Sequence, residues 1–477
     1  MTYKINEQKY RNRLATRLLY NEAGKITQTR GTLYEAHLPG AAVGSLCEII
    51  RDPRVSNSQR VEAEVIGFNE KRVQLMPFVD MAGVNKDSQV VLKEMVSSFT
   101  ISDAFLGRVI DARGRPIDGK GPIDHGGNDS EDLSLYQPTL DPLSRPMVEN
   151  PLDLGIRSIN GLITFGKGQR MGIMAGSGVG KSVLMGMAAR YTVADINVIA
   201  LIGERGREVK EFIERDLGPE GLKRSVVVVA TSDTAPLLRM RGAFLATSIA
   251  EFFRAKKKHV LLMMDSLTRF CMAQREIGLS MGEPPAQKGY TPSVFSTLPK
   301  LLERAGLSKS GGSITGLYTV LVEGDDVNDP IADSARAILD GHIVLSRRLA
   351  EINHFPAVDV LQSVSRVMTH VVSQDHLNVS RKIREWLSIY EQSRDMIEIG
   401  AYVRGTNPRL DQAILVHEKI KEFLRQDVPQ SSNFQETIAQ MKAIFAYAQA
   451  NSAEAQRQVQ EQAQFEAQQA AQRIPFS

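Results

Sequence analysis

The sequence has little of what would tie this chain to an oxidising or membrane environment. It has only two cysteines in 477 residues, Cys47 and Cys271, which gives no disulfide framework and fits a reducing compartment. We expect both to be small, buried apolar side chains. Its apolar runs, such as residues 260–264, fall far short of the about 20 residues that cross a bilayer, and residues 1–20 lack the apolar core of a secretory signal. The sequence therefore predicts a soluble cytoplasmic chain.

Charge of one sign and aromatic side chains are also scarce. The 58 basic and 55 acidic residues leave a net charge of only +3, and aromatic residues make up 6% of the chain. A nucleic-acid-binding protein concentrates basic residues on one face, so we expect no nucleic-acid partner. The eight histidines show no metal-ligand spacing. The chain does have 42% hydrophobic residues, enough for a real core, and a length that fits two or three domains.

The two ends of the chain are polar and helical in pattern. Residues 1–20 place Tyr10, Leu14 and Leu18 at helical spacing among basic residues, which fits either a docking helix for a partner or a frayed terminus. The segment from 435 onward is rich in Ala, Gln and Glu, and we expect its last two dozen residues to form an exposed or frayed helix.

Between the ends, the pattern changes twice. Residues 28–98 hold several short segments of β-forming residues separated by Gly, Pro, Asn and Asp, which predicts a small β-barrel with a structural or assembly role. Residues 107–146 are dense in Gly and Pro and are predicted to be a linker with tight turns. From 168 to 346, apolar strands alternate with helices, which predicts a parallel sheet covered on both faces. After about 370 the chain is mostly helical.

A phosphate-binding loop stands between the first of these strands and the next helix. The stretch "AGSGVGKS" follows an apolar strand, and such a loop turns its backbone N–H groups and the positive end of the helix toward phosphate oxygens. The strict pattern has Gly where this chain has Ala175, and we expect that change to be harmless if the backbone there is extended. Lys181 is expected to reach the β- and γ-phosphates, and the Ser182 hydroxyl to bind Mg²⁺. The predicted nucleotide-binding residues are Gly176, Ser177, Gly178, Val179, Gly180, Lys181, Ser182, Val183 and, from the resemblance described below, Phe355.

Two acidic residues end neighbouring apolar runs. Asp265 ends the predicted strand "HVLLMMD", residues 259–265, and is predicted to hold Mg²⁺. Glu204 follows "IALIG" and is predicted to polarise the attacking water, because the carboxyl ends of parallel strands are where such groups gather. The plainer alternatives are a turn aspartate and a surface glutamate beside Arg205 and Arg207. The combination predicts hydrolysis of a metal-bound triphosphate.

Many stretches beyond this loop resemble one family, the RecA-like rotary ATPases. They include "GERGREVKEFIE", "LLMMDSLTRF", "GEPPAQKGYTPSVF", "YTVLVEGDD" and "FPAVDVLQSVSR". This group contains the catalytic subunits of rotary ATP synthases and the ATPases of type III secretion, and the stretch "AGSGVGKSVLMGMAARYT" is most similar to its flagellar export branch. The resemblance covers roughly residues 25 to 425.

The resemblance implies an α/β fold with a RecA-like P-loop core, an N-terminal small β-barrel and a C-terminal helical domain. The boundaries we expect are a docking helix at 1–24, the barrel at 25–100, the ATPase domain at 101–365 and the helical domain at 366–477. It also implies a homohexameric ring that binds ATP and Mg²⁺ between subunits. A ring of identical copies fits a chain that carries both Glu204 and a finger arginine.

Three further roles come only from the resemblance. Arg205 matches the arginine that follows the water activator. Arg366, in "SVSRV", matches the arginine finger given to a neighbour's site, with a structural ion pair as the plainer alternative. Phe355 matches the aromatic residue that packs on adenine, with core packing as its alternative.

The predicted function is therefore a Mg-ATP-hydrolysing motor of flagellar type III protein export at the cytoplasmic face of the inner membrane. The resemblance implies a regulator at the N-terminus, a central stalk protein at the C-terminal domain, export substrates with their chaperones, and the export gate. Three alternatives remain: an injectisome ATPase, a Rho-like RNA translocase that would need basic and aromatic readout residues, and a non-catalytic ATP-binding subunit.

Overall fold

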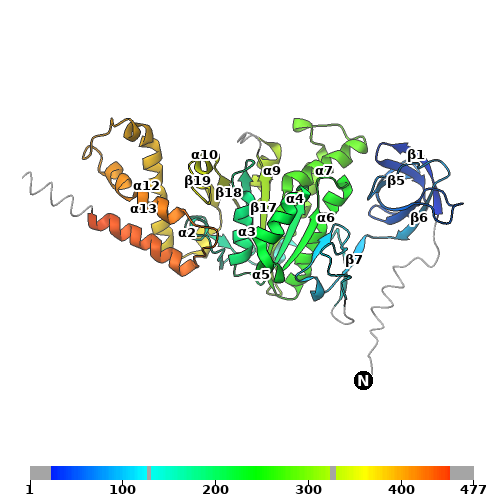
Figure 1. Cartoon of the computed structure of the whole chain (residues 1–477), viewed down its shortest axis with the longest axis horizontal. Coiled ribbons are helices and arrows are strands. Elements are labelled where there is room, and N and C mark those ends of the chain that lie inside the picture. The colour runs from blue at the N-terminus through cyan, green and yellow to red at the C-terminus, as the bar shows by residue number, and fades with distance from the viewer. Residues whose placement is uncertain (1–22, 126–129, 323–328, 452–477) are drawn as a thin grey trace, which may run out of the picture.

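The fold is known from a computed structural model that describes residues 23–125, 130–322 and 329–451. Three parts follow one another along the long axis: a β-barrel, a central α/β core and a group of C-terminal helices (Figure 1). The predicted fold class is confirmed. The helix predicted for residues 1–20 and the last two dozen residues lie outside the described part of the chain.

The N-terminal strands form a closed antiparallel barrel in the order β1-β2-β5-β4-β3-β6, as predicted. Every second residue points inward, so in β3 the side chains of Cys47 and Ile49 are fully buried while their neighbours are half exposed. The barrel strands are β1 Ala23–Arg30, β2 Leu33–His37, β3 Leu46–Ile50, β4 Arg60–Asn69, β5 Arg72–Pro77 and β6 Gln89–Glu94.

The central sheet is built on the continuous apolar runs of the sequence. Its order is β19-β18-β12-β17-β15-β13-β14-β8, with β16 paired to β17, and all pairs except β18–β19 and β16–β17 are parallel. All seven residues of β13 are buried, because alternate side chains enter two separate apolar clusters on the two faces of the sheet. The strands are β8 Val109–Asp111, β12 Arg170–Ala175, β13 Ile196–Ile202, β14 Ser225–Ala230, β15 His259–Asp265, β16 Gly306–Leu307, β17 Ser313–Leu321, β18 Gly341–Leu345 and β19 Val358–Ser365.

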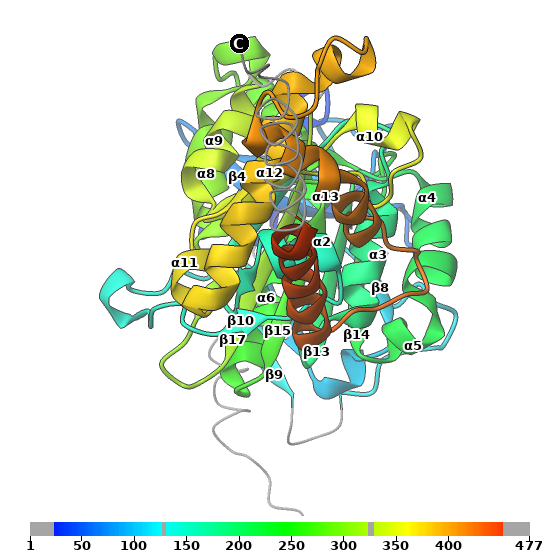
Figure 2. The same cartoon turned by 90° about the vertical axis from the view of Figure 1, so that its left-hand side faces the viewer.

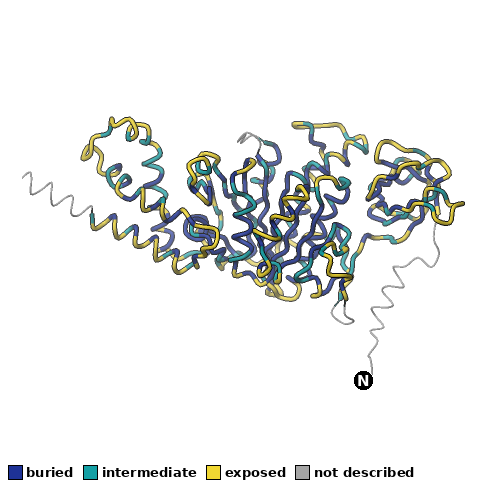
Figure 3. The backbone as a smooth tube through the Cα atoms, in the orientation of Figure 1, coloured by how far each residue is buried: buried dark blue, intermediate teal, exposed yellow. Residues whose placement is uncertain are grey.

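Helices cover both faces of the sheet, as predicted. One cluster joins the sheet to α6, α7, α8 and α9, and the other joins it to α2, α3 and the C-terminal helices. Figure 3 shows the sheet strands buried along their length. Cys271, on α7, lies in the first of these clusters, so both cysteines are buried and free, as expected. The helices of the core are α2 Arg157–Leu162, α3 Lys181–Tyr191, α4 Gly206–Glu211, α5 Gly218–Lys223, α6 Pro236–Ala255, α7 Leu267–Ser280, α8 Pro292–Leu302, α9 Pro330–Ile338, α10 Arg347–Glu351 and α11 Met368–Val371.

The segment 107–146 is more than the linker predicted for it. Its first apolar residues form β8, which extends the sheet beside β14, and residues Glu131–Ser134 form β9, which pairs with β7, Ser98–Ile101. Pairing occurs because Val109 and Ile110 are apolar and bury against the sheet. A further two-stranded pair, β10 Pro151–Leu152 with β11 Phe165–Gly166, leads into the core.

The C-terminal part is helical, as predicted. It consists of α12 Gln374–Glu398, α13 Pro408–Leu424 and a helix that is described from 434 to 451. The α12–α13 hairpin exposes Met396, Ile399 and Val403 at its tip. Within the described ranges, no helix is both long and apolar enough to cross a membrane.

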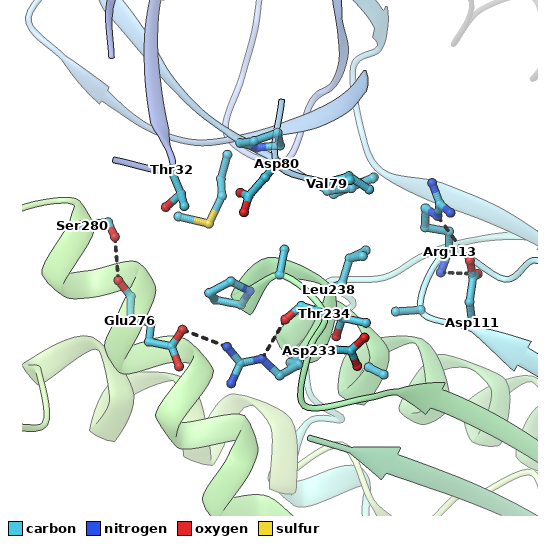
Figure 4. A pocket seen from close by; sticks show the side chains of 18 of the residues that line it. Thr32, Val79, Asp80, Asp111, Arg113, Asp233, Thr234, Leu238, Glu276 and Ser280 are labelled. Atoms are coloured by element: carbon cyan, nitrogen blue, oxygen red, sulfur yellow. Dashed lines mark hydrogen bonds and ion pairs between the residues drawn. The ribbon is translucent and has the colours of Figure 1, made fainter. Parts of the chain in front are cut away.

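The barrel meets the core across a cavity and a buried ion pair. The cavity measures about 820 Å³, and Thr32, Val79 and Asp80 of the barrel face Thr234 and Glu276 of the core across it (Figure 4).

Beside this cavity, the Arg241 guanidinium on α6 donates to Glu64 of β4 at 2.8 Å, and the Tyr136 hydroxyl donates to the same carboxylate at 2.7 Å. The buried pair joins the two parts of the molecule.

Candidate functional site

The phosphate-binding loop connects β12 to α3 at the carboxyl edge of the sheet. Ala175 is the last residue of β12, so its backbone is extended and its methyl group is buried in the core. Gly180 precedes α3 with a φ of 91°, a left-handed conformation that favours glycine. In the loop, Gly176 and Val179 are buried, whereas Ser177 and Gly178 are exposed. The loop therefore has the strand-to-helix geometry of an anion cradle.

Three predicted side chains meet beside this loop. The Lys181 ammonium, at the first residue of α3, donates to the Asp265 carboxylate and lies 3.4 Å from Oε1 of Glu204. Asp265 ends β15, and Glu204 lies just beyond the neighbouring strand β13, where Leu201 pairs with Asp265. The parallel sheet brings these residues together although they are far apart in the sequence.

Burial and mutual charge set the protonation of this cluster. Burial, and then the negative charge of Asp265, raise the pKa of Glu204 to about 8, although Lys181 acts in the opposite direction. Burial alone would lower the pKa of Lys181, but the carboxylates of Asp265 and Glu204 outweigh it and leave that pKa raised. The site therefore holds the Lys181 ammonium, which stays protonated, beside the Glu204 carboxyl group, which is basic enough to accept a proton near neutral pH.

Thr319 is a member of this cluster that the sequence did not reveal. Its hydroxyl donates to Oδ1 of Asp265 at 2.7 Å from β17, the strand between β12 and β15. The available signal was one of three serine and threonine residues, Ser313, Thr315 and Thr319, in a mostly apolar strand. Ser182 and Val183 follow Lys181 in the first turn of α3, and both are half-buried. Thr319 orients Asp265 toward the loop.

Phe355 also lies against the loop. Its ring carbons stand 3.6 Å from the position that a Cβ would occupy at Gly180, and 41% of the residue is exposed. The aromatic face therefore borders the phosphate-binding loop and remains accessible.

Two of the predicted residues do not join the cluster. Arg205 is exposed at the start of α4, with its guanidinium 3.8 Å from Glu208. Arg366 follows β19 at the opposite edge of the sheet, where its N–H donates to Asp340 at 2.9 Å and Asp340 in turn donates to Arg170, the first residue of β12. The loop is at the other end of β12, roughly 20 Å away at about 3.3 Å per residue. Arg366 therefore cannot reach the Lys181 site of its own chain.

Comparison with known proteins gives the same core in related chains. Residues 155–365 match the description "ATP synthase alpha/beta family, nucleotide-binding domain", and residues 372–443 match "T3SS EscN ATPase C-terminal domain". The "Flagellum-specific ATP synthase" of Pseudomonas aeruginosa is 52% identical over 429 residues, which are 90% of this chain and 94% of that protein. This chain belongs to the ATP synthase alpha/beta family.

Within this family, solved structures of a type III secretion ATPase match most of the chain. The assembled ATPase EscN of enteropathogenic Escherichia coli matches with a TM-score of 0.82 at 45% identity. The match covers 88% of this chain and 99% of the EscN chain. EscN in complex with its central stalk EscO has a TM-score of 0.80 at 44% identity, with the same coverage. The chain is accordingly an ATP-binding ATPase of the type III secretion branch, with the fold predicted from its sequence.

Proposed function

We propose that this ATPase drives flagellar type III protein export as a homohexameric ring with its active sites between subunits. One observation carries the proposal: Lys181, Asp265 and Glu204 converge at one edge of the sheet, while Arg366 is held at the opposite edge of the same chain. A complete hydrolytic site then requires a neighbour.

In this site, each part of the loop has its own task. The backbone N–H groups from Gly176 to Gly180 and the Lys181 ammonium bind the phosphates, and Phe355 covers the adenine. When phosphate oxygens arrive, Lys181 leaves its carboxylate partners for them. Glu204 then orients the attacking water and accepts its proton, a task to which its raised pKa suits it.

Asp265 and Ser182 would hold Mg²⁺. Within the described residues, no cluster of three or more histidine, cysteine, aspartate or glutamate side chains can hold a metal ion. Mg²⁺ does not require such a cluster, because it needs only one or two carboxylates besides phosphate oxygens and water. Thr319 fixes the Asp265 carboxylate at 2.7 Å, which fits an oxygen-ligand site of this kind. When bound, the ion would neutralise negative charge on the phosphates.

Arg366 of a neighbouring copy would stabilise the charge on the transferring phosphoryl group, a contribution of about 10³ to 10⁵ in rate. In this chain, the guanidinium donates to the backbone carbonyl oxygens of Leu339 and Arg336 at 3.2 and 3.1 Å. Arg366 is exposed, and these bonds hold its guanidinium at the end of α9. Arg205, next to Glu204, would contact the same interface.

The proposed partners follow the ends of the molecule. The N-terminal segment 1–24 would bind the flagellar regulator, and the C-terminal helices would bind a central stalk, as the complex of EscN with EscO supports. We place the ring in the cytoplasm, at the inner membrane beside the export gate, where it would act on export substrates and their chaperones.

An injectisome ATPase is the nearest alternative, since the chemistry is the same and only the cargo differs. The higher identity to a flagellum-specific protein, 52% against 45% for EscN, favours the flagellar assignment. A Rho-like translocase lacks comparable support, and stimulation of ATP hydrolysis by RNA would revive it.

Mixing two inactive variants tests the shared site. Lys181→Ala retains the finger arginine but loses the lysine that binds the phosphates. Arg366→Ala retains that lysine but loses the finger arginine. We expect each variant alone to be nearly inactive, and an equal mixture to recover about a quarter of the wild-type rate if subunits mix randomly in the ring. A mixture no more active than its components, with ring assembly verified by ultracentrifugation, would refute the trans arrangement.

A further inference from the structure

A short arm before the core carries two apolar side chains into solvent. This arm, residues 138–147, exposes 92% of Leu143 and 78% of Met147. In Figure 2 it is the cyan segment that leads into β10 and projects at the left of the molecule, beyond α11. Single exposed apolar side chains are common on protein surfaces, so these two become candidates for an interface only if the backbone holds them together in one geometry.

The backbone of the arm is fixed. Asp141 accepts a hydrogen bond from the Leu143 N–H at 3.0 Å, and a 3₁₀ turn covers Pro142–Ser144. The Arg145 guanidinium donates to the Glu303 side chain at 2.7 Å and to the Glu303 carbonyl oxygen at 2.6 Å. Prolines 138, 142 and 146 restrict the chain further. Leu143 and Met147 are thus presented in one geometry.

The same bonds connect the arm to Arg366. Glu303 bridges Arg145 to Arg170 at 2.5 Å, Arg170 pairs with the Asp340 carboxylate at 3.1 Å, and the Asp340 carbonyl oxygen accepts from the N–H of Arg366 at 2.9 Å. The chain of contacts runs from the arm, through the start of β12, to the finger residue.

Apolar packing joins the arm to the same surface a second time. Val148, directly after the arm, lies with Val367 and Val371 around Gly166, where an added Cβ would stand 2.1 Å from the Val148 methyl and 3.2 and 3.3 Å from the other two. Val367 is the next residue after Arg366. The arm and the finger therefore belong to one continuous surface.

We propose that the arm is a clasp for a second copy of this chain: Leu143 and Met147 bury themselves on the neighbour and thereby hold Arg366 in the neighbour's site. The inference rests on the proposed function, because it takes the Arg366 surface as the surface that faces the neighbour. A second copy is the partner that fits this surface, because Arg366 reaches no site in its own chain. The arm is connected to Arg366 through Glu303, Arg170 and Asp340.

The arm and the finger make different contributions. Burying a leucine-sized side chain changes an association constant by roughly 10- to 100-fold. The double variant Leu143→Ser, Met147→Ser should therefore need a protein concentration at least about tenfold higher to reach half of the full ATPase rate per chain. At saturating concentration it should recover the wild-type rate, whereas Arg366→Ala should stay inactive at every concentration.

Thiol labelling tests the burial directly, in a chain whose own cysteines do not interfere. Cys47 and Cys271 are fully buried, and burial raises the pKa of the Cys47 thiol to about 12 and that of Cys271 further. In the full-length Leu143→Cys variant, the maleimide labelling rate should fall at least about tenfold between the dilute monomer and protein assembled with a non-hydrolysable Mg-ATP analogue. The matched control is Val193→Cys, at a valine that is 59% exposed on another part of the core, and its labelling rate should stay unchanged.

The outcomes separate the two proposals. The clasp is overturned if the Leu143→Cys thiol reacts as fast in assembled rings as in the monomer. It is also overturned if the double serine variant shows the wild-type dependence of ATPase rate on concentration. Neither result contradicts the shared site. A wild-type chain that never assembles, and whose rate per chain is independent of concentration, overturns the ring itself and the clasp with it.

Discussion

At the scale of single residues, the proposed mechanism makes Glu204 the group on which hydrolysis would depend. Lys181 and Asp265, which are hydrogen-bonded to each other and, through Asp265, to Thr319, would instead bind the phosphates and the metal. Burial and the negative charge of Asp265 raise the pKa of Glu204, so its carboxylate is a stronger base than that of an ordinary glutamate.

Glu204→Gln should therefore lower kcat by about 10²- to 10⁴-fold while ATP still binds, because the amide fills the same space but accepts no proton. Turnover and equilibrium nucleotide binding should be measured on the same preparation. The matched control is Glu211→Gln, at an exposed glutamate at the end of α4, the helix that follows Glu204. It pairs with Arg207, and its replacement should leave turnover near wild type. An unchanged kcat in Glu204→Gln would show that another group accepts the proton.

How far the sequence predicts these residues depends on how far apart their partners lie. Asp265 and Glu204 were predictable, because each directly follows an apolar run and parallel strands end at a common edge. Thr319 was not, since a single hydroxyl in a strand does not tell which carboxylate it will meet. The match of Arg366 to the family's finger arginine can be seen from "SVSRV". Its distance from the loop cannot, because that distance depends on the register of β18 against β12 and of β19 against β18.

At the scale of elements, the strands of the core followed the sequence closely and the segments around them did not. The predicted run 259–265 is β15 to the residue. In contrast, the arm lay in what the Gly- and Pro-rich pattern indicated as a linker, and its partner Glu303 is 158 residues away from Arg145. Local composition predicts turns well, but it does not show which charged side chain, far away in the sequence, will hold a turn in place.

The loop between α10 and β19 is held by a histidine that is buried uncharged. His354 is 3% exposed, and its Nε2 has no hydrogen-bond partner among the described residues. Burial, and then the positive charges of Arg425 and Lys421 around α13, lower its pKa from 6.5 to about 4. The neutral imidazole is the form that fits this junction.

Stability should therefore fall as the pH drops from about 6.5 to about 4, because in that window the unfolded chain binds a proton that the folded chain refuses. The loss attributable to His354 is up to about 3 kcal/mol. Thermal unfolding at pH 7.5 and pH 5.0 should show a smaller pH dependence for His354→Asn than for wild type. His37→Asn, at the exposed end of β2, is the control. Equal pH dependence in wild type and His354→Asn would contradict this assignment.

At the scale of the whole molecule, the barrel is joined to the core by the buried pair of Glu64 and Arg241, whose side chains are 3% and 5% exposed. Removing one charge leaves the other buried and unpaired, at a cost of about 3 to 5 kcal/mol, whereas replacing both is far milder.

Calorimetry should show that Arg241→Met lowers the unfolding temperature markedly and that adding Glu64→Gln restores much of it. Glu48→Gln, which breaks partly exposed pairs with Arg60 and Lys93, should have an effect of less than about 1 kcal/mol. If the double variant were as unstable as Arg241→Met, the unpaired charge would not be the cause.

Strand β12 has the phosphate loop at its carboxyl end. Its amino end is hydrogen-bonded to Asp340, whose carbonyl oxygen also accepts from the N–H of Arg366. If the Arg366 end of one copy contacts the phosphate loop of the next, the two surfaces of that contact are different. Each copy then has one neighbour on its loop side and another on its Arg366 side. A ring closed in this way is a directed cycle, with a clockwise sense distinct from the anticlockwise one. Any displacement transmitted along β12, from an occupied loop to the finger, would then pass from copy to copy in a single direction.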